Sequence, residues 1–576
     1  LGNADRLYVG ATSGGAYAGI SIGQNKTLVI SVDSSVAKKV EISRASGLKN
    51  EMFVVSGGKL IFNESLKATI EIIGSGDSAS PLFSIANIGE LQLNAGVVIR
   101  SNTSLAHGGA IRVTSGSKAT LTRVSFEDLN VTSENGPAYG GCVYAEESTI
   151  LIDSCAFTKC GTKGTVASSG GAVYANKCTL TIKDTRFTDC YSELATLGAN
   201  AFGGAIYVEQ TEFNLTGDRA TNSTVFTNNR ASSGGAIYQI GNITNEETIS
   251  GVVFQGNKAL YGNGGALHLS AQGLRTINIL DSYFTNNTAT LGETGSETGL
   301  GGGAYLAIVG NFVNIKNITA QQNTAFSGGG LYIKGGFVTM DTCVVTGNIA
   351  NADSGIGGGI VVEGNGAVGT IEFIDTKIDS NSAYKGGGLY IGEDMAVKTT
   401  RYDEEVTTTY EKEGGGTITE TEIIAHYVEI FSNSAKLGAG LYYAGGQNYA
   451  NTDCVIELDD IRVYDNKFNG SIDENVKGGG IYFEKSGDVK VIIKDSSIYS
   501  NTAYLGGGIY TQDVTEIKDG AYVTMNIELN NVYISNRTDD YTYKRNDDGE
   551  LVYDSNGNKV VTSHRVSYKD ANKATI

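Results

Sequence analysis

Residues 226–238 read FTNNRASSGGAIY, and both motifs in this stretch recur along the chain. The first motif is a Gly-Gly pair followed by a small residue, an aliphatic residue and usually tyrosine. Thirteen copies occur, most of them 27 to 33 residues apart, and they begin at Gly108, Gly140, Gly170, Gly203, Gly234, Gly264, Gly301, Gly328, Gly357, Gly386, Gly438, Gly478 and Gly506. The second motif, FxxN or its aliphatic equivalent, precedes many of these pairs. Thirteen copies in phase indicate a repeat protein.

The period and the residues between the motifs predict the fold. Short alternating runs such as TLTI at residues 179–182 and VKVII at 489–493 are typical of strands. No stretch shows the 3.6-residue period of an amphipathic helix, and a double glycine would weaken a helical repeat. We therefore predict a right-handed parallel β-helix with three short strands per coil of about 30 residues.

Each motif has a physical role in such a coil. The Gly pair allows a turn between two sheets, and the aliphatic residue that follows points inward. The asparagine of FxxN is expected at a corner, where its amide bonds the equivalent asparagine of the next coil. The predicted ladder comprises Asn229, Asn257, Asn287, Asn323, Asn348, Asn381, Asn433, Asn466, Asn501 and Asn536.

The paired GGA[IVL] and FxxN motifs resemble the repeats of chlamydial polymorphic outer-membrane proteins and related adhesin-type β-helices. The segment 81–110, PLFSIANIGELQLNAGVVIRSNTSLAHGGA, resembles an entry coil of such proteins. The resemblance covers about residues 80–536. It implies a surface protein built on a β-helix.

The fifth position of the Gly-Gly motif is tyrosine in ten of the thirteen copies. Because this position follows an inward aliphatic residue, alternation places it on the outside. Tyr332, Tyr390 and Tyr442 are therefore candidates for a contact stripe that binds sugars or a neighbouring molecule. The alternative is cross-strand stacking that only stabilises the sheet.

Two of the seven cysteines occupy the ladder position in consecutive coils, FTKC ending at Cys160 and FTDC ending at Cys190. One strand spacing separates such positions, so a Cys160–Cys190 disulfide is predicted. The other five cysteines are expected to be buried and unpaired.

Composition argues against a nucleic-acid partner. The formal charge of −19 opposes binding to nucleic acid or to an anionic membrane. No apolar run approaches the ~20 residues of a membrane helix. Possible glycosylation sequons lie at Asn25, Asn63, Asn102, Asn130, Asn214, Asn222, Asn242, Asn286, Asn317, Asn469 and Asn536.

The repeat suggests three parts. Residues 1–80 are interpreted as a cap with irregular first coils, residues 81–536 as the β-helix, and residues 537–576 as a polar hairpin or cap. The last part contains the turn signals Asp548-Gly549 and Asn556-Gly557. A polar hairpin is expected to protrude near residues 395–421.

The predicted function is that of an extracellular structural or adhesive surface protein, a β-helical rod that acts by extended surface contact. Its expected partners are other copies of itself, a surface protein or a glycan, and self-assembly would build a filament. No catalytic, cofactor or metal residues are assigned. The alternative is a polysaccharide lyase or hydrolase, for which Asp453, Asp459 and Asp460 are the best but poorly spaced carboxylates.

Overall fold

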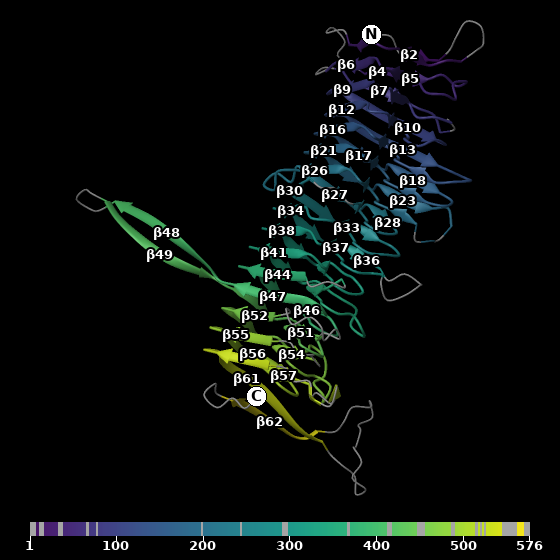
Figure 1. The fold of residues 1–576 in the computed structure, drawn as a ribbon. Helices are drawn as coiled ribbons and strands as arrows, with labels where there is room; N and C mark the ends of the chain where they lie inside the picture. Colours follow the sequence, from purple (N-terminus) through teal and green to yellow (C-terminus); the bar gives the residue numbers. More distant parts are fainter. Residues whose placement is uncertain are drawn as a thin grey trace. The chain divides into compact units, whose positions relative to one another are not determined.

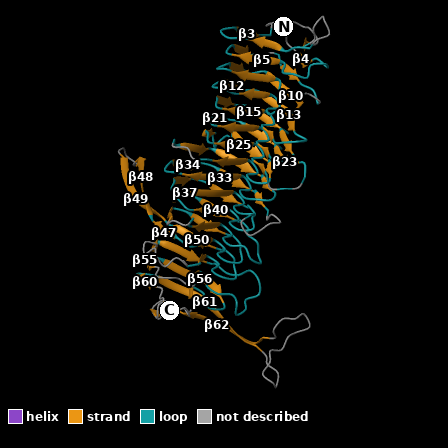
Figure 2. Cartoon of the chain, turned by 45° about the vertical axis from the view of Figure 1, so that its right-hand side comes forward, coloured by secondary structure: helices purple, strands orange, loops and turns teal. Residues whose placement is uncertain are grey.

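The computed structural model describes residues 7–10, 17–32, 39–64, 68–76, 79–196, 198, 200–241, 245–290, 298–365, 369–411, 417–445, 455–484, 490–512, 517–518, 521–522, 526–543 and 561–569. Every regular element among them is a strand (Figure 2). The chain divides into two compact units. Unit 1 comprises Leu1–Phe326 and Gly330–Tyr332, and unit 2 comprises Ser327–Gly329 and Ile333–Ile576.

Unit 1 consists of three parallel sheets whose strands stack coil by coil in sequence order (Figure 1). The tyrosine sheet contains β2 (Ile20–Ile22), β5 (Phe53–Ser56), β8 (Phe83–Ala86), β11 (Ile111–Val113), β15 (Val143–Glu146), β20 (Val173–Asn176), β25 (Ile206–Glu209), β29 (Ile237–Ile240), β33 (Leu267–Gln272) and β37 (Ala304–Val309). The third sheet contains β3 (Thr27–Ile30), β6 (Lys59–Phe62), β9 (Glu90–Leu93), β12 (Lys118–Thr122), β16 (Thr149–Asp153), β21 (Thr179–Lys183), β26 (Glu212–Thr216), β30 (Glu247–Ser250), β34 (Thr276–Leu280) and β38 (Phe312–Lys316). The phenylalanine sheet contains β1 (Leu7–Val9), β4 (Val40–Arg44), β7 (Ile70–Ile73), β10 (Val97–Ser104), β13 (Ser125–Thr132), β17 (Ala156–Thr158), β22 (Arg186–Thr188), β27 (Thr224–Thr227), β31 (Val252–Gln255), β35 (Tyr283–Thr285) and β39 (Thr319–Gln321).

Short strands accompany the corners of unit 1. Within the phenylalanine sheet, these are β18 (Gly161–Gly164), β23 (Tyr191–Leu194), β28 (Arg230–Ala231), β32 (Lys258–Ala259) and β36 (Thr288–Ala289). A small separate sheet contains β14 (Ala138–Tyr139), β19 (Ser168–Ser169) and β24 (Ala201–Phe202). Strand β40 (Leu331–Lys334) has residues in both units.

Unit 2 repeats the three sheets. Its tyrosine sheet contains β43 (Ile360–Glu363), β46 (Leu389–Ile391), β51 (Leu441–Tyr443), β54 (Ile481–Phe483) and β57 (Ile509–Thr511). Its third sheet contains β41 (Phe337–Asp341), β44 (Gly369–Ile374), β47 (Met395–Thr400), β52 (Val455–Asp459), β55 (Lys490–Lys494) and β60 (Asn526–Asn530). Its phenylalanine sheet contains β42 (Val344–Thr346), β45 (Lys377–Asp379), β50 (Val428–Phe431), β53 (Ile461–Tyr464), β56 (Ser497–Ala503) and β61 (Tyr533–Tyr543). The two-stranded pieces are β48 (Tyr402–Glu411) with β49 (Thr417–His426), and β58 (Ile517–Lys518) with β59 (Ala521–Tyr522).

Repeated side chains fill the core because the register keeps equivalent positions together. Strands β25 and β29, for example, pair in parallel with Tyr207 opposite Tyr238. Phenylalanines at the phase of the FxxN motif stack inside unit 1 with ring centroids 4.5 to 5.1 Å apart, from Phe126 through Phe157, Phe187, Phe226 and Phe254 to Phe284. Burying each ring contributes about 1.5–3 kcal/mol. The core is thus a continuous aromatic stack at one phase of the coil.

The Gly-Gly pair is required by the backbone at the turn. Gly234 has φ of 59°, a left-handed conformation that glycine adopts without strain. A Cβ on Gly235 would collide with the carbonyl oxygen of Gly265 in the next coil. The first glycine therefore makes the turn and the second permits the coils to stack.

The boundaries differ from the sequence interpretation. Parallel pairing already begins with β1 and β4, so regular coils start well before residue 81. Residues Met395–Thr400 form β47, a normal strand of the third sheet, so the protruding hairpin starts at Tyr402. Strand β61 pairs in antiparallel fashion with β62 (Val561–Lys569), whereas the turn signals at residues 548–549 and 556–557 lie outside the described residues.

One buried polar cluster interrupts the apolar core of unit 1. Glu247 occupies an inward position of β30 opposite Ile277 of β34. Its Oε2 atom accepts from Nη1 of Arg275 at 2.9 Å and from Nε2 of Gln239 at 2.7 Å, and all three residues are 2 or 3 % exposed. Among the described residues, Oε1 of Glu247 and Nε and Nη2 of Arg275 have no hydrogen-bond partner. Burial raises the pKa of Glu247 to about 7, although Arg275 opposes the shift.

Candidate interaction surfaces

The asparagine ladder is buried and stabilises the corners. In unit 1, Nδ2 and the backbone N–H of Asn229 both donate to Oδ1 of Asn257, at 2.9 and 3.0 Å. The same pairs of bonds link Asn257, Asn287 and Asn323 in unit 1, and Asn348, Asn381, Asn433, Asn466 and Asn501 in unit 2. These side chains are 0 % exposed. They therefore hold the fold and offer no surface for binding, while the side chain of Asn536 lies outside the described residues.

The disulfide joins Cys142 to Cys160, which corrects the expected Cys160–Cys190 bridge. Cys142 fills the third position of its Gly-Gly motif, and its Cα atom lies 6.2 Å from that of Cys160. Other coils show the same proximity, because a Cβ on Gly359 or Gly388 would touch the following ladder residue, Asn381 or Asn433. Cys190, Cys155 and Cys178 are free, buried thiols. Cys343 is buried, and Cys454 lies outside the described residues.

The tyrosines point outward from their sheet but are covered, which corrects the expected exposed stripe. Tyr442 is 0 % and Tyr332 5 % exposed, and Tyr390 is partly buried. Their rings stack in ladders, with Tyr390 and Tyr442 5.3 Å apart. Replacing Tyr332, Tyr390 and Tyr442 by serine would thus weaken packing as well as any surface contact, so the triple change cannot isolate adhesion.

In several coils the residue just before the Gly-Gly pair supplies part of this cover. Phe202 lies 4.7 Å from the ring of Tyr238 in the next coil, and Tyr139 lies 4.8 Å from Tyr174. In unit 2, Nζ of Lys385 donates to the hydroxyl of Tyr442 at 3.0 Å. Burial raises the pKa of Tyr174 and of Tyr442. The outward tyrosines of this sheet and the side chains that cover them therefore form a second packed layer outside the core.

His268 replaces tyrosine in this ladder and predicts acid sensitivity. Its ring stacks 4.3 Å from Tyr238, and burial lowers its pKa to about 4 from 6.5. In the unfolded chain His268 takes up a proton as the pH falls below 6.5, whereas in the folded chain it does so only near pH 4. The free energy of unfolding is therefore unaffected by this group above pH 6.5 and falls as the pH drops toward 4. We expect the free energy of unfolding of the wild type to fall by about 3 kcal/mol between pH 7 and pH 4 because of His268, and we expect this fall to be absent in His268→Tyr. Chemical denaturation at both pH values measures it, and equal acid sensitivity of wild type and variant would contradict the assignment.

The sequons fall into different environments. Asn25, Asn63, Asn222, Asn286 and Asn469 are exposed, and Asn130, Asn214 and Asn317 are partly buried. Asn102 is 0 % exposed, and its Nδ2 donates to the carbonyl of Gly109 at 2.6 Å, so a glycan there is incompatible with this fold. Asn242 and the side chain of Asn536 lie outside the described residues.

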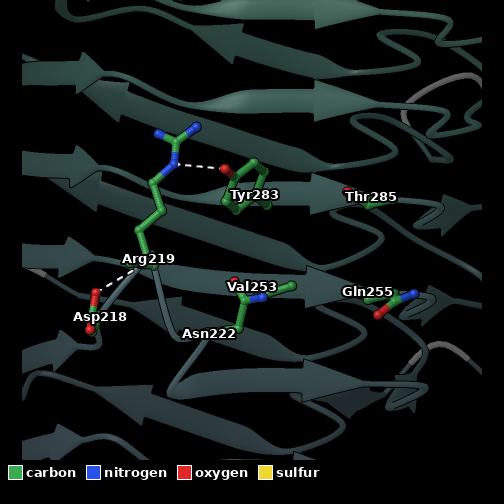
Figure 3. Close-up of a pocket in the computed structure, with 8 residues that line it drawn as sticks. Asp218, Arg219, Asn222, Val253, Gln255, Tyr283 and Thr285 are labelled. Atoms are coloured by element: carbon green, nitrogen blue, oxygen red, sulfur yellow. Dashed lines mark hydrogen bonds between the residues drawn. The ribbon is translucent and has the colours of Figure 1, made fainter.

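A groove of about 750 Å³ lies on the outer face of the phenylalanine sheet in unit 1 (Figure 3). One wall is the loop at residues 217–223, and the floor is formed by outward side chains of β31 and β35. Arg219 crosses the floor and donates from Nε to the hydroxyl of Tyr283 at 2.9 Å. It also donates from Nη1 to the carbonyl of Asn317, and its guanidinium lies 4.3 Å from the Tyr283 ring. Sequence reasoning missed this groove, whose signal is the polar insertion GDRATNS after β26.

The β48–β49 hairpin projects from unit 2 (Figure 1). Its ten residue pairs run without a register shift from Tyr402–His426 to Glu411–Thr417, and neither strand pairs with any other described strand. Three large apolar side chains among the described residues of the hairpin are exposed: Tyr402 at 51 %, Ile423 at 67 % and Ile424 at 39 %. The hairpin thus adds a surface that the repeating coils do not supply.

Charged and aromatic contacts hold the base of the hairpin. The His426 ring nitrogens lie 3.3 Å from Oδ2 of Asp375 and 3.2 Å from Oε2 of Glu404. The Tyr427 ring lies 3.5 Å from the guanidinium carbon of Arg462 and 5.6 Å from that of Arg401. The hairpin is therefore oriented where it leaves the coil.

Of the three carboxylates weighed for catalysis, the structure describes Asp459 and Asp460. Oδ2 of Asp459 accepts from Nζ of Lys494 at 3.0 Å, and Asp453 lies outside the described residues. Burial and the neighbouring Asp459 raise the pKa of Asp460. Within the described ranges, no group of three His, Cys, Asp or Glu side chains could hold a metal ion. The described residues also contain no helix long and apolar enough to span a membrane.

Comparison with known proteins supports the fold. Residues 70–245 match the family model described as "Right handed beta helix region". One similar solved structure is titled "Structure of PL6 family alginate lyase AlyGC"; it is 12 % identical, the match covers 88 % of this chain and 76 % of that chain, and the TM-score is 0.31. No curated protein matches the chain. The chain folds as a right-handed parallel β-helix with three strands per coil.

Proposed function

We propose that this chain is an extracellular structural or adhesive surface protein that acts by surface contact. The projecting β48–β49 hairpin is the observation that carries the proposal. A two-stranded ribbon is marginally stable alone in water, so a ten-pair ribbon is an unusual feature to maintain without a contacting surface. The resemblance of the GGA[IVL] and FxxN repeats to adhesin-type β-helices supports the same reading.

Removing the hairpin tests this function. Replacing residues 404–424 by a short Asn-Gly turn keeps the pair Tyr402–His426 and the strands β47 and β50. We expect beads coated with this variant to lose most of the attachment to intact cells, or to copies of the protein, that wild-type beads show. The thermal unfolding midpoint should change little, because the hairpin pairs with no other strand that the structure describes.

One control variant accompanies this experiment. The single change Asn469→Ala alters an exposed residue of the same unit and should leave attachment intact. Unchanged attachment of the hairpin-less variant would contradict the proposed function. If attachment is lost, electron microscopy of natively isolated material distinguishes adhesion from filament formation.

The groove beside Arg219 favours a second candidate, a carbohydrate-active enzyme. Its polar groups, including Gln255, Thr285 and Asn222, are suited to sugar hydroxyls. A screen for cleavage of anionic and neutral polysaccharides, with Arg219→Ala as the comparison, tests this candidate. Cleavage that the substitution abolishes would replace the proposal above.

A further inference from the structure

We propose that the β48–β49 hairpin binds a lysine- or arginine-rich β-strand of another protein, which adds to a free edge of the ribbon. This inference rests on the proposed function and specifies its partner. The ribbon forms a separate two-stranded sheet, so the outer edge of each strand pairs with no described strand. Such edges present unpaired backbone donors and acceptors in the geometry of a sheet.

The edges lack several of the usual protections against strand addition. Natural edge strands are often short, or carry proline, lysine or a bulge. Here both strands have ten residues, neither contains proline or lysine, and the pairing has no register shift. At about 3.4 Å per residue, each edge offers roughly 34 Å of regular backbone.

The charge of the ribbon selects the partner. Residues 402–426 contain seven acidic residues and one lysine, in a chain whose total formal charge is −19. Two copies of this ribbon would repel each other, so the charge opposes self-pairing and favours a cationic strand. The acidic residues are Asp403, Glu404, Glu405, Glu411, Glu413, Glu420 and Glu422.

Apolar groups and the anchored base complete the surface. Ile423 and Ile424 are exposed on consecutive positions of β49, so each face of the ribbon presents one isoleucine. Apolar side chains of an added strand can pack on either. The contacts of His426 and Tyr427 orient the ribbon before binding, which reduces the entropy lost on association.

A synthetic peptide with ten alternating lysine and valine residues is the probe. Its length matches β48. We expect it to bind the full chain, with its own amides protected from hydrogen exchange in the complex. Changing Glu405, Glu411, Glu420 and Glu422 to glutamine, which leaves the contact between Glu404 and His426 in place, should weaken binding at least tenfold and lower its dependence on salt.

Two controls separate strand addition from general attraction to an acidic protein. Removing four exposed acids elsewhere, by Glu127→Gln, Glu134→Gln, Glu147→Gln and Asp353→Asn, should change affinity less than twofold. A peptide with the same charge but N-methylated at alternate residues cannot pair along an edge and should bind at least tenfold more weakly.

Equal loss of binding in the two charge variants, or equal binding of the N-methylated peptide, would overturn the inference. These outcomes are independent of the attachment experiment. If the hairpin-less variant loses attachment and the peptide still binds it as well as wild type, the proposed function stands and the cationic partner is rejected.

Discussion

Replacing Asn257 with alanine is expected to lower the free energy of unfolding by about 3–5 kcal/mol, because four hydrogen bonds meet at this side chain. Its Oδ1 accepts from the backbone N–H and from Nδ2 of Asn229, at 3.0 and 2.9 Å. Its Nδ2 donates to the carbonyl of Phe226 and to Oδ1 of Asn287, each at 3.0 Å. The residue is 0 % exposed, so water cannot replace these partners without a rearrangement.

Denaturant unfolding of the Asn257→Ala variant measures this loss, and the exposed Asn469→Ala variant serves as the control. Long repeat arrays can unfold in steps, so the transition of unit 1 has to be followed by hydrogen exchange of its own amides. A loss below 1 kcal/mol at Asn257 would mean that neighbouring coils compensate for the missing ladder residue.

The ladder could be predicted from the sequence because phase alone specifies it. A residue that recurs once per coil at one corner meets its equivalent in the next coil, as Asn229 meets Asn257. The disulfide required more information. Cys160 has Cys190 as its neighbour along the stack, but it also faces the third position of the preceding Gly-Gly motif across the coil, where Cys142 lies. Distances across the cross-section of a coil are not encoded by the repeat period.

The tyrosine ladder illustrates a similar limit. Alternation correctly indicated that Tyr442 points away from the core, since it stacks on its equivalents on the outside of the sheet. Alternation does not indicate what lies above a sheet. The covering residues immediately precede the Gly-Gly pairs, where Phe202, Lys385 and Lys477 all contact the tyrosine of the following coil. Aromatic or long side chains at that position were the available signal.

The groove and the hairpin depend on insertions, which a repeat does not constrain. Sequence periodicity indicated a hairpin near residues 395–421, but residues Met395–Thr400 satisfy the coil pattern and remain in the third sheet. The position of Arg219 over Tyr283, two coils away, depends on the conformation of an irregular loop. Sites formed by insertions therefore require the structure.

The buried cluster of Gln239, Glu247 and Arg275 can be tested with one variant that is expected to be less stable than wild type and one that is expected to be at least as stable. Changing Glu247 alone to alanine leaves Arg275 charged and without a carboxylate in the core. We expect the free energy of unfolding to fall by about 3–5 kcal/mol. Circular dichroism during denaturation, together with exchange of the β30 and β34 amides, measures the effect.

Replacing all three residues by apolar ones is expected to have the opposite result. The neighbouring coils carry Leu269 opposite Gln239 and Ile277 opposite Glu247. The triple change Gln239→Leu, Glu247→Ile and Arg275→Met restores this apolar pattern and removes the polar atoms that have no partner among the described residues. Because desolvation of a buried ion pair can exceed its attraction, the triple variant should be as stable as wild type or more stable by about 1–4 kcal/mol. If the triple variant is instead as unstable as Glu247→Ala, the buried ion pair is a net stabilising contact.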